Sequence, residues 1–125
     1  MTIPLDAENL FAETVTIPAG ASKADAVWTQ GRALVGIIMP AGWDAAQVGF
    51  EIGVAATGTF VTAVDNTGNY EQAKGAASVA ITFPTTDALF GPYLIAKSVD
   101  ASNAAVNQSA ARTLTLILRR LLGGS

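Results

Sequence analysis

The chain has 125 residues, of which half are hydrophobic and only 14% are charged, and it contains neither cysteine nor histidine. This length corresponds to one domain with a sizeable core. The missing residue types exclude disulfides, zinc–thiolate sites and a serine–histidine triad, and a net charge of −3 disfavours a nucleic-acid-binding surface.

The sequence contains no apolar run of the roughly 18 residues that a membrane span requires. Residues 1–6 also lack the basic start and the apolar core of a signal peptide. We therefore expect the protein to be made and kept in the cytoplasm, and to leave it only by lysis or within a larger particle.

Residues 1–12 mix proline and acidic residues with isolated apolar side chains. Two interpretations are open: an N-terminal arm that lies on a neighbouring molecule, or a frayed terminus. Leu5, Leu10 and Phe11 favour the arm, because apolar side chains are costly to leave in water.

Beyond the arm, turn residues recur about every ten positions, and no segment has the period of an amphipathic helix. Residues 32–39 are almost continuously apolar, as expected of a central strand buried on both faces. Residues 47–54 alternate, which places Val48, Phe50, Ile52 and Val54 on one face. The segments with strand-like composition are 13–17, 24–29, 32–39, 47–54, 59–64, 70–74, 78–83, 93–99 and 112–120.

The last of these segments has the clearest pattern. Leu114, Leu116 and Leu118 are predicted to face the core, while Ile117 lies on the opposite face with Thr113, Thr115 and Arg119. The arginines at 112, 119 and 120 are expected to be a solvated strand edge. Leu121 and Leu122 follow in the tail.

Together these features predict an all-β protein, a single antiparallel β-sandwich or jelly-roll-like domain of about eight short strands. We expect an N-terminal arm over 1–12, the sandwich over 13–120 and a C-terminal tail over 121–125.

The candidate catalytic groups are few. Ser22 and Lys23 form a possible serine–lysine pair, but nothing in the sequence orients it. Glu51 and Glu71 lie on predicted strands and are expected to be solvated, because charged residues rarely go inside. We predict no enzymatic activity and no cofactor.

Asp65, Asn66 and Asn69 supply hard oxygen ligands in a short span, which raises calcium as an option. Their spacing does not match an EF-hand loop, and a tight turn requires the same residues. We therefore predict a turn and no metal.

Two tryptophans have different predicted environments. Trp28 lies in a predicted strand and is expected in the core, whereas Trp43 follows a Pro-Ala-Gly loop and is expected to be exposed. An exposed Trp43 suits a protein contact, because it combines a large apolar area with one polar group. Local packing under the loop and sugar stacking remain open for the same ring.

Three segments, taken in order, resemble a family of small tailed-phage virion proteins. They are LVGIIMPAGW at 34–43, DALFGPYL at 87–94, and VNQSAARTLTL at 106–116, which runs on to Arg119. The resemblance spans roughly residues 13–120 and implies a β-sandwich building block encoded among head and tail genes.

Taken together, we expect a capsid decoration (cement) protein that binds and stabilises the assembled head, located in the virion. Its expected partners are the major capsid protein or other virion proteins and further copies of itself, as a homotrimer, with no nucleic acid or membrane. The predicted interface residues are Leu10, Phe11, Trp43, Ile117, Leu121 and Leu122. The alternatives are a glycan-binding module of a head or tail fibre, with Trp43 and Tyr70 as stacking platforms, and a tail or connector component.

Overall fold

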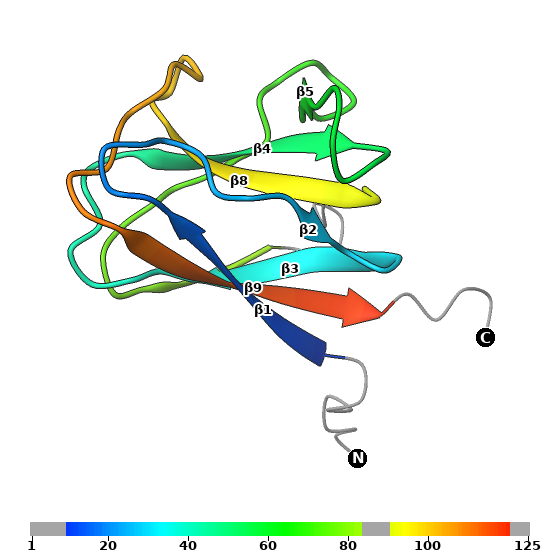
Figure 1. The fold of residues 1–125 in the computed structure, drawn as a ribbon, viewed down its shortest axis with the longest axis horizontal. Coiled ribbons are helices and arrows are strands. Elements are labelled where there is room, and N and C mark those ends of the chain that lie inside the picture. The colour runs from blue at the N-terminus through cyan, green and yellow to red at the C-terminus, as the bar shows by residue number, and fades with distance from the viewer. Residues whose placement is uncertain (1–9, 84–90, 121–125) are drawn as a thin grey trace.

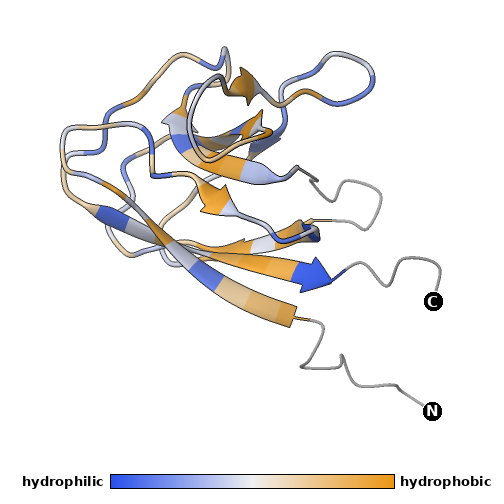
Figure 2. Cartoon of the chain, turned by 45° about the vertical axis from the view of Figure 1, so that its right-hand side comes forward, coloured by the Kyte–Doolittle hydropathy of each residue, from blue (hydrophilic) through white to orange (hydrophobic). Residues whose placement is uncertain are grey.

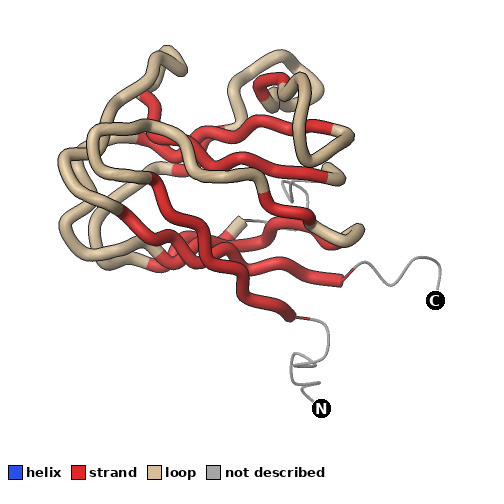
Figure 3. The backbone as a smooth tube through the Cα atoms, in the orientation of Figure 1, coloured by secondary structure: helices blue, strands red, loops and turns tan. Residues whose placement is uncertain are grey.

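The computed structural model describes residues 10–83 and 91–120. Within these ranges the regular secondary structure consists of β-strands, without a helix (Figure 3). The all-β prediction is confirmed. The strands are β1 (Leu10–Ile17), β2 (Val27–Trp28), β3 (Arg32–Ile38), β4 (Gln47–Gly53), β5 (Val61–Thr62), β6 (Gln72–Ala73), β7 (Ala80–Thr82), β8 (Tyr93–Val99) and β9 (Arg112–Arg120).

The strands form two antiparallel sheets packed face to face, an antiparallel β-sandwich (Figure 1). One sheet, here the β9 sheet, has the order β1-β9-β3-β7. The other, here the β4 sheet, has the order β2-β8-β4-β5, and β6 also pairs with β4. Each sheet therefore has a long strand pair at its centre; the β4 sheet has short strands toward its edges, whereas the β9 sheet has the long strand β1 at one edge and the short strand β7 at the other.

The core lies between the two sheets, and β9 contributes its largest aliphatic row. Leu114, Leu116 and Leu118 are fully buried, as their alternation predicts. From the opposite sheet, Val48 and Phe50 of β4 are buried against them in the same cluster. One face of β9 thus packs in the core, and its other face lies on the outside of the sandwich.

Several predicted boundaries differ from the structure. β1 begins at Leu10, three residues before the predicted start at 13, so Leu10 and Phe11 belong to the sandwich and not to the arm. Val54 was predicted to continue the strand and share a face with Val48, Phe50 and Ile52, which is wrong: β4 ends at Gly53 and Val54 is 86% exposed. The ring of Phe60 occupies the space beside Gly53, within 2.8 Å of where a β-carbon would be.

The central strand β3 is also only partly as predicted. Leu34 and Ile37 are fully buried on the inner face, and Ala33 and Gly36 are buried on the outer face, so most of the strand is covered on both faces as predicted. Ile38, at the end of the strand, is exposed. A register shift between Leu34 and Gly36 interrupts the pairing with β9, and such a bulge changes which side chains face outward.

Candidate interaction surface

The outer face of the β9 sheet carries two of the predicted contact residues, Leu10 and Ile117. Residues opposite each other in an antiparallel ladder share a face. Leu10 pairs with Arg119, and Ala12 pairs with Ile117. From the register, this face consists of Leu10, Ala12, Thr14, Thr16, Ala33, Gly36, Ile38, Ala80, Thr82, Thr113, Thr115, Ile117 and Arg119.

This outer face is nearly uncharged. Among the described residues that form it, Arg119 is the one charged side chain. Thr16 and Thr113 join their hydroxyls in a hydrogen bond of 2.9 Å between Oγ1 atoms, so part of the polar surface is already satisfied within the chain. A face of hydroxyls, methyls and aliphatic side chains is cheap to take out of water compared with a charged one.

Phe11, also predicted as a contact residue, already has partners inside the chain. The guanidinium carbon of Arg32 lies 4.5 Å from the ring centroid, and that of Arg120 lies 5.2 Å from it. The ring is half-buried and packs against the core. Its position therefore does not depend on a neighbouring molecule, and Arg120 is not simply part of a solvated edge. Figure 2 shows the apolar start of β1 beside the hydrophilic end of β9.

The two tryptophans have the opposite of their predicted environments. Trp43 is 6% exposed and its indole Nε1 donates a hydrogen bond of 3.1 Å to the carbonyl of Ala46. Trp28 is 59% exposed and lies opposite Tyr93 at the edge of the β4 sheet. The prediction of an exposed Trp43 is wrong because the loop folds back over the core, where Gly75 leaves room for the indole.

Glu51, predicted to be solvated, is buried in an ion cluster on the outer face of the β4 sheet. Its carboxylate lies 3.1 Å from the Lys97 ammonium and 3.0 Å from that of Lys23. Lys97 is itself buried and lies 3.4 Å from the Thr62 hydroxyl. Burial alone would raise the pKa of Glu51, but the hydrogen bonds from Lys23 and Lys97 outweigh it and hold the pKa below its ordinary value.

The candidate catalytic pairs are not assembled by this arrangement. Lys23 directs its ammonium to Glu51, and Glu51 is neutralised by two lysines. Glu71 lies elsewhere, at an opening between β6 and β7.

The Asp65 segment forms a turn. One oxygen of Asp65 accepts hydrogen bonds from the backbone N–H groups of Thr67 and Asn69 and from the Thr67 hydroxyl. The Thr67 hydroxyl and the Asn69 N–H lower the pKa of Asp65 most strongly. Within residues 10–83 and 91–120, no group of three or more acidic side chains that could hold a metal ion occurs.

A polar cluster at the start of β9 had no signal in the sequence. Arg112 lies 3.2 Å from Asp44, and the fully buried Gln108 accepts a hydrogen bond from the Asp44 N–H and donates one to Ser98. Hydrogen bonds from Ser109, reinforced by Arg112, lower the pKa of Asp44. Because Gln108 follows a polar loop in sequence, only the fold shows that it joins two loops beneath the surface.

Leu121 and Leu122, the remaining predicted contact residues, lie outside the described residues. Within the described part of the chain, no helix has the length and apolarity to cross a bilayer. Comparison with protein-family models, curated protein sequences and solved structures found no match to this chain.

Proposed function

We propose that the protein is a virion structural protein, a capsid decoration protein that binds assembled heads through the outer face of its β9 sheet. The observation that carries this proposal is the near absence of charge from that face, combined with Leu10 and Ile117 at one end of it. The centres of protein interfaces are depleted in charged residues. The resemblance to tailed-phage virion proteins supports the same assignment.

The mechanism is mass action. A protein that binds the assembled shell but not its separated subunits stabilises the shell by the free energy of binding. Each aliphatic side chain buried at the contact contributes about 1.5–3 kcal/mol, an upper bound once the cost of association is included. Self-association, for which we propose a trimer, would multiply weak single contacts through avidity.

The test is a charge placed on the apolar part of the proposed contact face. Ile117→Lys should weaken binding to heads stripped of this protein by at least about 100-fold, because a lysine would be desolvated at the interface. Binding is measured by co-sedimentation, and the melting temperature reports on folding. Val54→Lys is the matched control, since Val54 is exposed at the end of β4 in the other sheet.

If folded Ile117→Lys saturates heads as the unsubstituted protein does, the β9 sheet is not the binding face. If the unsubstituted protein does not bind heads at all, the proposed function is wrong.

A glycan-binding module is the second candidate, and it now depends on a different ring. Trp28 and Tyr93 lie side by side on the outer face of the β4 sheet, and Trp28 is the more exposed of the two. Trp43 is buried and cannot act as a stacking platform. Binding on a glycan array that Trp28→Ala abolishes would support this function over the first.

A further inference from the structure

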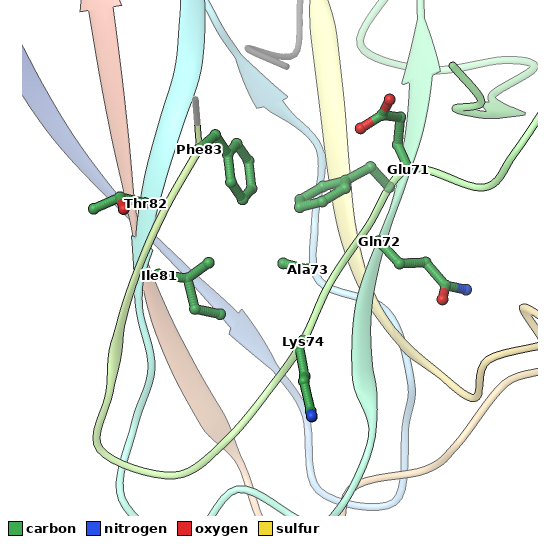
Figure 4. A pocket seen from close by; sticks show the side chains of 8 residues that line it. Glu71, Gln72, Ala73, Lys74, Ile81, Thr82 and Phe83 are labelled. Carbon is green, nitrogen blue, oxygen red and sulfur yellow. The ribbon is translucent and has the colours of Figure 1, made fainter. Parts of the chain in front are cut away.

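Among residues 10–83 and 91–120, one side of the sandwich is not closed. Between β6 in one sheet and β7 in the other lies an opening of about 240 Å³. This exceeds the roughly 150 Å³ that holds benzene in an engineered protein cavity, so it has room for an aliphatic side chain. Figure 4 shows Ile81 and Phe83 on one side of it and the segment from Glu71 to Lys74 on the other.

Half of the residues that line this opening belong to the core or pack against it. Phe83 meets the ring of Phe50 edge to face, with 6.2 Å between ring centroids. Ile81 and Phe83 are half-buried and pack against the core cluster, and Ala73 is buried within it. The other half of the lining is polar and consists of Glu71, Gln72, Lys74 and Thr82. An apolar side chain that entered here would extend the core.

The strand beside the opening has one unpaired edge among the described residues, because β7 is the last strand of its sheet. The N–H of Phe83 donates to Val35, and the carbonyl of Val79 accepts from Met39. In an antiparallel ladder, alternate residues point their backbone groups to the same neighbour. Ala80 and Thr82 therefore direct theirs away from β3, and both residues are exposed.

An occupant of this site should be an extended segment with apolar side chains at every second position, so that it pairs with β7 and fills the opening. Residues 1–9 of this chain have that pattern, with Ile3, Leu5 and Ala7 separated by Pro4 and Asp6. A proline is compatible with an added edge strand where its nitrogen faces solvent. The tail at 121–125 has two consecutive leucines followed by glycines and lacks this alternation.

We infer that the arm of one subunit, residues 1–9, adds a strand to the open edge of β7 in a second copy of this chain. Leu5 or Ile3 then fills the opening between β6 and β7, and the acidic Asp6 can approach Lys74 at its rim.

The sheet order favours exchange between copies. The arm leaves the sandwich from β1, and β1 and β7 are the two opposite edges of the β9 sheet. Nine extended residues reach about 30 Å, enough to span to a neighbouring molecule. Because the donating and accepting surfaces differ, the contact is head-to-tail, and it closes into a ring when the rotation between subunits permits.

Three variants test the inference by light scattering and sedimentation over a range of concentrations. Removal of residues 1–9 and the substitution Leu5→Asp should each weaken self-association, the latter by about 10- to 100-fold, the value of one buried leucine. Thr82→Pro should weaken it as well, because it removes an N–H that faces away from β3. Thr82→Val is the matched control, since it retains that N–H.

If Thr82→Pro does not fold, Leu5→Asp in the arm decides, since residue 5 precedes the sandwich. A full-length protein that remains monomeric at high concentration overturns the inference. So does a protein without residues 1–9 that associates as tightly as the full chain.

Disulfide trapping distinguishes exchange from folding back. The chain has no cysteine, so Thr82→Cys can be combined in turn with Ile3→Cys, Pro4→Cys, Leu5→Cys and Asp6→Cys without competing thiols. Oxidation of at least one pair to covalent oligomers supports exchange. Cross-linking confined to monomers, or no cross-link in any pair, contradicts it.

This inference rests on the proposed function, because it supplies a contact between decoration subunits. Different experimental outcomes would contradict the arm contact and the capsid proposal. Protein lacking residues 1–9 that still binds heads, with unchanged self-association, would remove the arm contact and leave the capsid proposal. Arm-dependent oligomers that do not bind heads would do the reverse.

Discussion

The outer faces of the two sheets differ although their inner faces are alike. Both sheets direct aliphatic and aromatic side chains into one core. Outside, the β9 sheet presents threonines, small residues and three aliphatic side chains, Leu10, Ile38 and Ile117, whereas the β4 sheet carries Glu51 and Lys97. These two charges are buried and satisfied within the chain.

The difference bears on which of the two outer faces costs less free energy to cover. A buried ion pair gains little from further desolvation and loses much when one member is removed. A neutral face with few unsatisfied groups can be covered at low cost. The charged part of the β4 face is therefore paired within its own chain, which supports the proposal that the β9 face contacts another molecule.

The largest effect on stability is expected from the β4 face. Lys97→Ala should lower the free energy of unfolding by about 3 kcal/mol, because it leaves Glu51 buried beside a single, largely exposed lysine. Lys23→Ala, measured in parallel by urea unfolding, should cost less than about 1 kcal/mol, as expected for an exposed partner. Equal losses in the two variants would show that this cluster is a surface feature and would remove the contrast between the faces.

Acid should sharpen the contrast. The pKa of Glu51 lies below its ordinary value of 4.5 in the folded protein. At pH values between the lowered pKa of the folded protein and the ordinary pKa of the unfolded chain, the unfolded chain therefore binds more protons than the folded one. Stability from this group is thus present above the ordinary value and is lost as the pH falls through the lowered one. Glu51→Gln should therefore be less stable than the unsubstituted protein at pH 7, and the difference should shrink toward pH 3.

Urea unfolding at a series of pH values measures this difference, with Glu13→Gln as a control for a more exposed carboxylate. A gap between Glu51→Gln and the unsubstituted protein that stays constant with pH would show that Glu51 does not titrate below its ordinary range.

The smallest effect is expected on the β9 face. Thr113→Val removes the hydrogen bond to Thr16 on an exposed pair, and the free energy of unfolding should change by no more than about 0.5 kcal/mol. A loss above 1 kcal/mol in the isolated protein would mean that this face is part of the domain's own stabilisation, and the argument for an open contact face would weaken.

The fold class and the closing strand followed from the sequence because alternation is a local property. Leu114, Leu116 and Leu118 face the core and Ile117 faces outward, as the period of two predicts. The short strands at Val61–Thr62 and Gln72–Ala73 lie within the predicted segments 59–64 and 70–74, but the predicted strands were too long. Their length depends on how far each can pair with β4, which no local pattern reports.

By itself, then, the sequence determined an all-β sandwich with β9 in its core and no thiol or imidazole chemistry. Only the tertiary structure decided that Trp43 is buried and Trp28 exposed, and that Glu51 is held by Lys97, 46 positions away. It also decided that the described residues leave an opening between β6 and β7. The physical reason is the same in each case: burial and charge pairing depend on residues distant in sequence, whereas strand alternation depends only on adjacent ones.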